Sequence, residues 1–226
     1  MLLFQGVEMR RIYAISDGRF QTNNKIDKTL VSLLNKENPK IVLLPMALEL
    51  PSFPETSLKS WVDQFQKRYG EELGCQTDVI YTNDNPSEEM IREKILSADA
   101  VYVGPGHVPT MLDKMKQFGF DKILREGYEK GIVMAGMSAG AMCWFEPYLR
   151  FAKSKFHPHY QGYERINDGY AAKDPTATLF VDERIGQVVK LDQTADVYLF
   201  KTVDGVRKRI TINSPSEANT VNTINQ

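Results

Sequence analysis

The sequence has little of several residue types that mark particular classes of protein. Its 226 residues include only two cysteines, Cys75 and Cys143, which excludes a disulfide framework and favours a reducing compartment. Only three histidines occur, His107, His157 and His159, so few residues can act as a general base. No clear metal-ligand spacing is present, and we expect neither a metal nor a cofactor.

The chain also lacks a charge excess and long hydrophobic runs. Its formal net charge is -1 and its pI is near 6.3, so no overall field attracts nucleic acid or an acidic membrane. No long basic cluster occurs in the sequence. The short cluster Arg207-Lys208-Arg209 is interpreted as an exposed edge strand. The apolar start, Met1-Leu2-Leu3-Phe4, is too short for a signal peptide, and no stretch approaches the roughly 20 apolar residues of a membrane span. We therefore expect a cytoplasmic protein, with a homodimer left open.

What is present is a regular alternation of apolar runs and helical patterns, with 42 % hydrophobic residues. This favours a single domain over residues 1–226, with residues 1–8 as an extension and residues 213–226 as a disordered tail. Buried strands are predicted over 12–15, 41–44, 79–81, 100–103 and 132–135. Helices are predicted over 26–34, 57–73, 86–96, 108–118 and 123–128. Shorter strands follow over 178–181, 187–191, 197–200 and 207–210.

Strands that alternate with helices predict an α/β fold. We expect a three-layer αβα sandwich with a mostly parallel, flavodoxin-like central sheet, to whose edge the short C-terminal strands add in antiparallel fashion. In such a sheet the ligand crevice lies at the carboxyl ends of the strands. The segment Gly104–His107 and the residue Ser138 both follow predicted strands, so the two are expected to face one crevice.

The most informative motif is Gly136-Met137-Ser138-Ala139-Gly140. It lies between the apolar run 132–135 and a helix-compatible segment, which is the context of a nucleophile elbow. The flanking glycines remove Cβ atoms that would clash in so sharp a turn. A glycine-rich turn with an incidental serine is the alternative.

A serine needs a neighbouring base, and the base in turn needs an orienting acid. The pair His157 and His159 lies after Ser138 in the chain, and in an extended strand both side chains would point to the same side. Glu146 is the one acid between Ser138 and His159 and is the candidate for the orienting carboxylate. Three later acids cannot be placed from the sequence: Glu164, Asp168 and Asp174.

Negative charge on a tetrahedral intermediate needs preorganised donors. The N–H of Ala139 is the natural first donor of an oxyanion hole because it follows the nucleophile. Gly106 is the candidate for the second, since Pro105 has no N–H. Cys143 is a rival nucleophile, but five residues along a helix turn it about 140° away from Ser138, so it is interpreted as core.

These motifs resemble those of the dipeptidase E and cyanophycinase family of serine peptidases, and most of all its peptidase E-like branch. The resemblance rests on the elbow 136–141, its continuation Cys143-Trp144-Phe145-Glu146 and the later Pro158-His159-Tyr160, and it covers Arg11 to about Phe200. It implies a class I glutamine amidotransferase-like fold, with Ser138 as nucleophile and His159 as general base. The family further implies hydrolysis of small peptides, chiefly dipeptides with an N-terminal aspartate.

Two departures from the family pattern affect the expected site. Where the family usually has Gly-Gly-Gly-Asn-Thr after the fourth strand, this chain has Gly104-Pro105-Gly106-His107-Val108. The segment before the histidine is also shortened to 147–156 and contains no acid. Either Glu146 or a downstream acid completes the triad, or the chain is a weakened or inactive family member that acts as a binding protein. A third alternative is an amidotransferase-like enzyme that uses Cys143.

Overall fold

The computed structural model describes residues 9–17, 20 and 24–212. The expected extension over 1–8 and the expected tail over 213–226 lie outside these described residues. Within them, the larger of two sheets has the strand order β3-β2-β4-β5-β1-β8-β9. Its strands are β1 (Arg11–Ile15), β2 (Lys40–Leu44), β3 (Gln76–Val79), β4 (Ala100–Val103), β5 (Val133–Met137), β8 (Thr176–Val181) and β9 (Arg184–Lys190).

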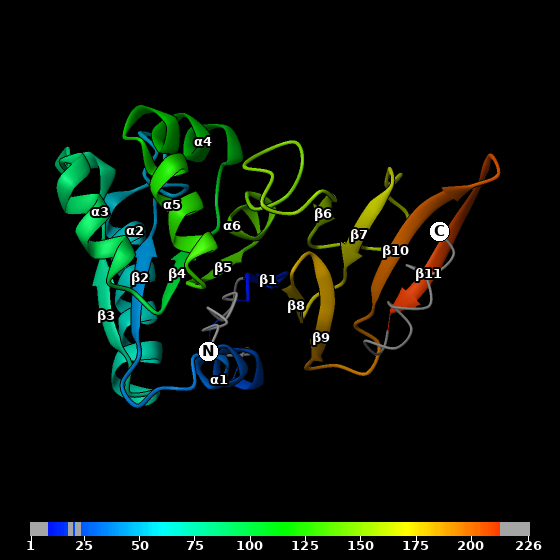
Figure 1. Ribbon diagram of the computed structural model, residues 1–226, viewed down its shortest axis with the longest axis horizontal. Coiled ribbons are helices and arrows are strands. Elements are labelled where there is room, and N and C mark those ends of the chain that lie inside the picture. The colour runs from blue at the N-terminus through cyan, green and yellow to red at the C-terminus, as the bar shows by residue number, and fades with distance from the viewer. Residues whose placement is uncertain (1–8, 18–19, 21–23, 213–226) are drawn as a thin grey trace, which may run out of the picture.

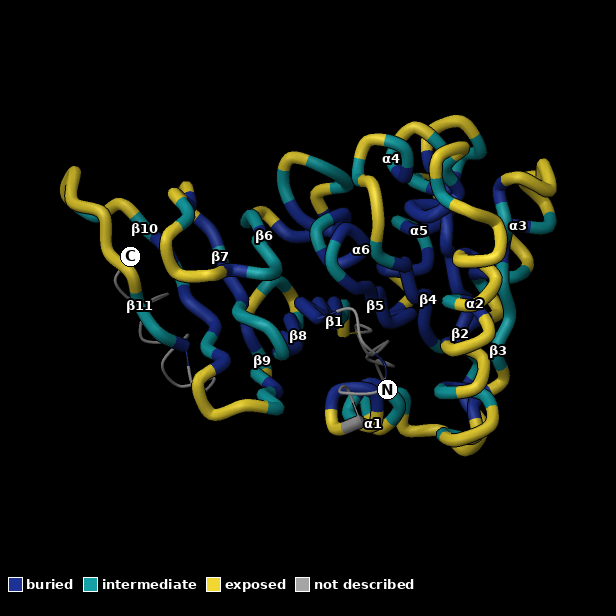
Figure 2. Tube along the Cα trace, turned by 180° about the vertical axis from the view of Figure 1, so that it is seen from behind, coloured by how far each residue is buried: buried dark blue, intermediate teal, exposed yellow. Residues whose placement is uncertain are grey.

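The large sheet is mostly parallel, as predicted. β1 runs parallel to β5, and β2 runs parallel to both β3 and β4, while β8 and β9 add in antiparallel fashion at one edge. Apolar runs without alternation form these strands because both faces of the sheet are covered. The tube in Figure 2 is accordingly buried along the central strands, and the exposed stretches lie mainly on the outer helices and loops.

Helices cover both faces of this sheet (Figure 1). They are α1 (Asn24–Leu33), α2 (Glu55–Phe65), α3 (Glu88–Leu96), α4 (Val108–Gln117), α5 (Phe120–Glu129) and the one-turn α6 (Ala139–Met142). Alternate residues of β1 divide between two cores: Ile12 packs with α3, α4 and α5, whereas Tyr13 packs with α1 and α2. The predicted three-layer αβα sandwich is therefore confirmed.

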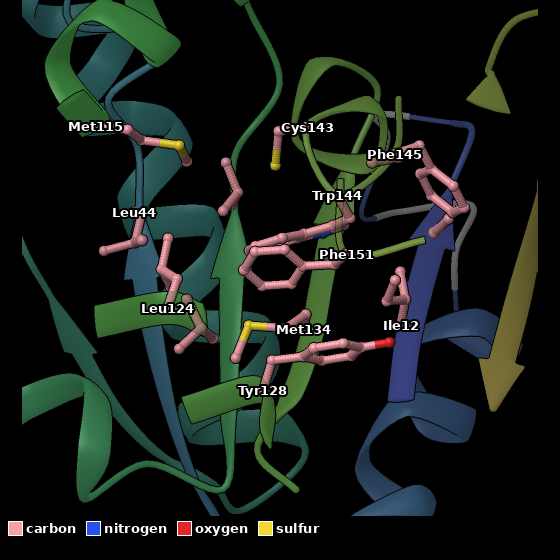
Figure 3. Packing of buried hydrophobic residues seen from close by; sticks show 14 of the residues in the cluster. Ile12, Leu44, Met115, Leu124, Tyr128, Met134, Cys143, Trp144, Phe145 and Phe151 are labelled. Atoms are coloured by element: carbon pink, nitrogen blue, oxygen red, sulfur yellow. The ribbon is translucent and has the colours of Figure 1, made fainter. Parts of the chain in front are cut away.

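The core on the α3, α4 and α5 face is closed by aromatic residues that follow the serine motif. In Figure 3, Trp144 and Phe151 lie over β4 and β5, next to Tyr128 of α5. The ring centroids are 5.4 Å apart for Trp144 and Phe151 and 4.9 Å apart for Tyr128 and Phe151. Phe151, Ala152 and Phe156 of the shortened segment after the motif thus belong to the core.

The helix predicted over 57–73 differs in its second half. The α-helical part ends at Phe65, and the wider π-helical segment η1 (Gln66–Glu72) continues it. Two successive side chains of this segment reach one buried carboxylate: Asp27 accepts a hydrogen bond from the Tyr69 hydroxyl at 2.9 Å and lies 3.1 Å from Nε of Arg68.

The end of the chain forms a second sheet that the sequence did not predict. Its strand order is β11-β10-β7-β6, and its strands are β6 (Phe156–His157), β7 (Gly169–Ala172), β10 (Val197–Val203) and β11 (Val206–Ile212). The strands predicted over 178–181 and 187–191 do extend the large sheet, whereas those over 197–200 and 207–210 belong to this smaller one. In Figure 1 the smaller sheet lies beside the β8–β9 edge.

Candidate active site

Ser138 lies in a sharp turn at the carboxyl end of β5. Its φ of 54° and ψ of -112° are strained for a residue with a side chain. The turn is held by a hydrogen bond of 2.9 Å from Ser138 N–H to the carbonyl of Ile15 in the neighbouring strand β1. A Cβ on Gly136 would lie 2.3 Å from the Gly140 oxygen, and one on Gly140 would lie 2.1 Å from the Val103 oxygen. Both glycines are therefore needed for the close approach of turn and sheet.

The helix after Ser138 is much shorter than expected. α6 ends at Met142, and turns follow where the sequence predicted a helix through Phe145. So short a helix has only a small macrodipole at its N-terminus beside Ser138. Cys143 is fully buried, and burial raises the pKa of its thiol well above the usual range, so it belongs to the core, as interpreted from the sequence.

His159 is the histidine that contacts Ser138. Its Nε2 lies 2.8 Å from the Ser138 hydroxyl oxygen, which is hydrogen-bond distance. The segment is not an extended strand throughout, because β6 ends at His157 and His159 has a φ of 59°. The expectation that His157 and His159 share one side of a strand is therefore wrong, although both line the same cavity. Burial and the nearby charge of Lys155 lower the pKa of His157.

The acid bonded to His159 is Asp174, not Glu146. Asp174 Oδ2 lies 2.6 Å from His159 Nδ1, and this hydrogen bond raises the pKa of His159 against the opposing effect of burial. The prediction of Glu146 as the orienting acid is thus wrong for this structure. Glu146 lies beyond α6, where its backbone N–H donates to the carbonyl of Ser154.

Asp174 is positioned by the residues on either side of it. The Ser16 hydroxyl donates to the carbonyl of Lys173 at 3.0 Å, and Ser16 N–H donates to the carbonyl of Thr176 at 2.9 Å. Ser16 and Thr176 are both fully buried, and Ser16 directly follows β1. The turn that carries Asp174 is thereby fixed to the strand next to β5, the strand that ends at Ser138.

The hydrogen bonds of the other downstream acids go to groups other than the His159 ring. The carboxylate of Glu164 accepts hydrogen bonds from the N–H groups of Gln161 and Gly162 at 2.9 to 3.0 Å. Asp168 accepts hydrogen bonds from the backbone and hydroxyl of Thr202. No sequence motif distinguished Asp174 from these two. Asp174 differed from them only in its place shortly before the strand predicted over 178–181.

A cavity of about 300 Å³ opens beside Ser138 and His159. Gly106 and Ala139, the two predicted oxyanion donors, both line it. Gly106 has a φ of 135°, and a Cβ there would lie 2.2 Å from the carbonyl oxygen of Ala47, so a glycine is required. The third histidine, His107, is not part of the arrangement, because its Nδ1 lies 3.0 Å from the Thr110 hydroxyl at the start of α4. The other lining residues are Val108, Met142, His157, Pro158, Tyr160, Glu164 and Ile166.

Across residues 9–17, 20 and 24–212, no group of three or more His, Cys, Asp or Glu side chains is arranged to hold a metal ion. None of the helices in the same residues has the length and apolar character required to cross a membrane.

A bonded serine, histidine and aspartate at the carboxyl ends of parallel strands define a site of the serine-hydrolase type. The family to which the chain belongs is peptidase family S51, whose model matches residues 12–155, more than half of the chain. This confirms the resemblance inferred from the motifs, and family membership supports a peptidase of the serine type. Since the match ends before His159 and Asp174, the assignment of those two residues rests on the geometry alone.

Individual relatives agree with this membership. The chain is 28% identical over 219 residues to a protein named uncharacterized peptidase YgaJ from Bacillus subtilis (strain 168), with 84% of this chain and 91% of that protein covered. A crystal structure of a peptidase from an acI-B1 Actinobacterium matches with a TM-score of 0.70 at 17% identity, over 94% of this chain and 98% of the other. A putative peptidase E protein from Listeria monocytogenes EGD-e matches with a TM-score of 0.58 at 18% identity, over 81% and 100%. At these identities the two structures establish the fold.

Proposed function

We propose that the protein is an active serine peptidase that hydrolyses short peptides through an acyl-enzyme on Ser138. The observation that carries the proposal is the continuous chain of hydrogen bonds from Ser138 through His159 to Asp174, with distances of 2.8 and 2.6 Å. Such a chain supplies the base that a serine hydroxyl needs and the acid that orients the base.

In the proposed reaction Ser138 Oγ attacks the carbonyl carbon of the scissile peptide bond while His159 Nε2 takes the hydroxyl proton. The tetrahedral intermediate places its negative charge on the former carbonyl oxygen, for which the N–H groups of Ala139 and Gly106 are the proposed donors. His159 then gives the proton to the leaving amine, and the C–N bond breaks. Water, with its proton taken by His159, hydrolyses the ester to release the acid and restore Ser138.

For substrates we propose dipeptides with an N-terminal aspartate, in keeping with the family resemblance. A cavity of about 300 Å³ is small enough to favour short peptides over folded chains. Lys155 and Arg165 are the cations that we propose could meet a substrate carboxylate. The charge of Lys155 acts on His157, which lines the cavity, and Arg165 lies between the lining residues Glu164 and Ile166. The free, unpaired state of Cys75 and Cys143 is in keeping with the proposed cytoplasmic location.

The test compares the wild-type protein with Ser138→Ala on a panel of aspartyl dipeptides and their alanyl counterparts. We expect the wild type to hydrolyse the aspartyl series and Ser138→Ala to lose turnover by about 10⁶-fold, down to the background of the assay. A serine-directed fluorophosphonate should label the folded wild type and leave Ser138→Ala unlabelled. Equal hydrolysis by both proteins would contradict the proposal, and a folded wild type without labelling would favour a catalytically silent binding protein.

A further inference from the structure

A buried carboxylate, Glu49, is paired with a mostly buried lysine, Lys114, near the segment that contains Gly106. Glu49, in the loop after β2, has a fully buried side chain whose Oε2 lies 3.2 Å from Nζ of Lys114 in α4. The Thr82 hydroxyl donates to the same carboxylate oxygen, and the Thr82 N–H donates to it at 3.2 Å. Lys114 also donates to the Thr82 hydroxyl oxygen at 2.8 Å and to Asn83 Oδ1 at 3.0 Å. We call these four residues, Glu49, Thr82, Asn83 and Lys114, the Glu49 cluster.

The Glu49 cluster joins the two segments that confine Gly106. On one side, Glu49 follows Ala47 by two residues, and the carbonyl oxygen of Ala47 lies 2.2 Å from where a Cβ on Gly106 would be. The same carbonyl accepts a hydrogen bond of 2.9 Å from His107 N–H. On the other side, α4 begins at Val108 and carries Lys114. Gly106 therefore lies between a loop and a helix that the Glu49–Lys114 pair holds together.

A buried ion pair of this kind needs an explanation beyond stability. Removing two charges from water costs several kcal/mol per ion, and apolar residues of similar size often stabilise a core better. What the pair does provide is a fixed geometry. If Glu49 moved away from its partners, its charge would be buried without hydrogen bonds, which is costly. The pair fixes this geometry next to the Gly106 segment, whose N–H is the proposed donor to the developing oxyanion.

We infer that the Glu49 cluster is a positioning device for the Gly106 N–H, so that Glu49 and Lys114 contribute to turnover without contacting the substrate, Ser138, His159 or Asp174. The inference rests on the proposed function, since it concerns the oxyanion hole of that reaction. A displaced donor stabilises the transition state less, and the loss of one oxyanion donor lowers kcat by about 10²- to 10³-fold. A displaced donor leaves ground-state binding and the titration of His159 largely unaffected.

The test uses Glu49→Gln, which keeps the shape of the side chain and removes its charge. We expect kcat for p-nitrophenyl acetate and for the cleaved dipeptide to fall about 10- to 100-fold, with KM changed less than about threefold and the acid limb of the pH profile unmoved. The rate of fluorophosphonate labelling should fall in proportion to kcat, because the phosphonyl oxygen uses the same donors.

The matched control is Asp78→Asn, which removes a partly exposed ion pair with Lys94 (2.8 Å) on another part of the same sheet and should leave kcat unchanged. If Glu49→Gln does not fold, as judged by its melting curve, Thr82→Val decides with the same readouts. If Ser138→Ala loses activity while the cluster variants keep the wild-type kcat, as Asp78→Asn should, this inference is overturned and the proposed function stands. Full activity in Ser138→Ala would overturn both.

Discussion

At the scale of the residue, the site depends on a few groups whose chemical type is dictated by geometry. Gly136 and Gly140 let the strained turn at Ser138 lie against β4, and any Cβ there would overlap backbone oxygens. His159 Nδ1 is hydrogen-bonded to the Asp174 carboxylate, which leaves Nε2 facing the Ser138 hydroxyl. Loss of the carboxylate would leave the ring free to take the other tautomer.

Asp174→Asn tests this arrangement through both rate and pH dependence. General base action requires neutral His159, so kcat/KM should decline as the pH falls below the raised pKa of His159. Without the Asp174 carboxylate that pKa falls, and the acid limb should move to lower pH while kcat drops by about 10⁴-fold. Glu146→Gln is the control and should change neither quantity. A pH–rate profile that moves with Glu146→Gln and not with Asp174→Asn would refute the assignment.

At the scale of the element, the π-helical segment η1 packs against one buried acid, Asp27. Asp27 in α1 is fully buried, and burial raises its pKa to about 7 against the opposing effects of Tyr69 and Arg68. A carboxyl group with a raised pKa in the folded state favours folding when it is protonated. Its contribution to the stability is therefore greatest at low pH and is lost as the pH rises from its usual value of 3.8 through about 7.

Asp27→Asn should remove this pH dependence and retain the hydrogen bond to Tyr69. We expect the free energy of unfolding of the variant, relative to that of the wild type, to increase as the pH rises from 4 to 8. Urea denaturation at several pH values measures the difference. A difference that stays constant over this range would mean that Asp27 has the same pKa in the folded and unfolded chain.

At the scale of the whole molecule, aromatic residues join the two sheets into one core. Phe156 of β6 packs on Phe145, with ring centroids 5.2 Å apart, and on Phe180 of β8, with centroids 6.2 Å apart. Phe180 in turn contacts Tyr170 of β7 at 5.1 Å. His159 follows β6 by two residues, and the neighbouring Tyr160 N–H donates to the carbonyl of Ala172 in β7 at 3.0 Å, so the small sheet helps to position the proposed base.

Phe156→Ala should destabilise the protein by about 3–5 kcal/mol, because it opens a cavity between the two sheets. Tyr163→Ala is the matched control on the same stretch of chain, where a ring that is 84% exposed should contribute less than about 0.5 kcal/mol. Chemical denaturation compares the three proteins. A small effect of Phe156→Ala would show that the two sheets do not share a core.

By itself the sequence determined the alternation of strands and helices, the place of Ser138 at the end of a parallel strand, and the histidine pair, His157 and His159, that supplies its hydrogen-bond partner. These features are local, since apolar runs, glycine sterics and short motifs act over a few residues. The tertiary structure decided which acid serves His159, because the turn with Asp174 is fixed by hydrogen bonds to Ser16, 157 residues from Lys173. It also decided that β10 and β11 belong to a separate sheet. It likewise brought Glu49 and Lys114, 65 residues apart, into contact near Gly106. Contacts over such separations depend on how whole layers pack, which no local pattern of residues specifies.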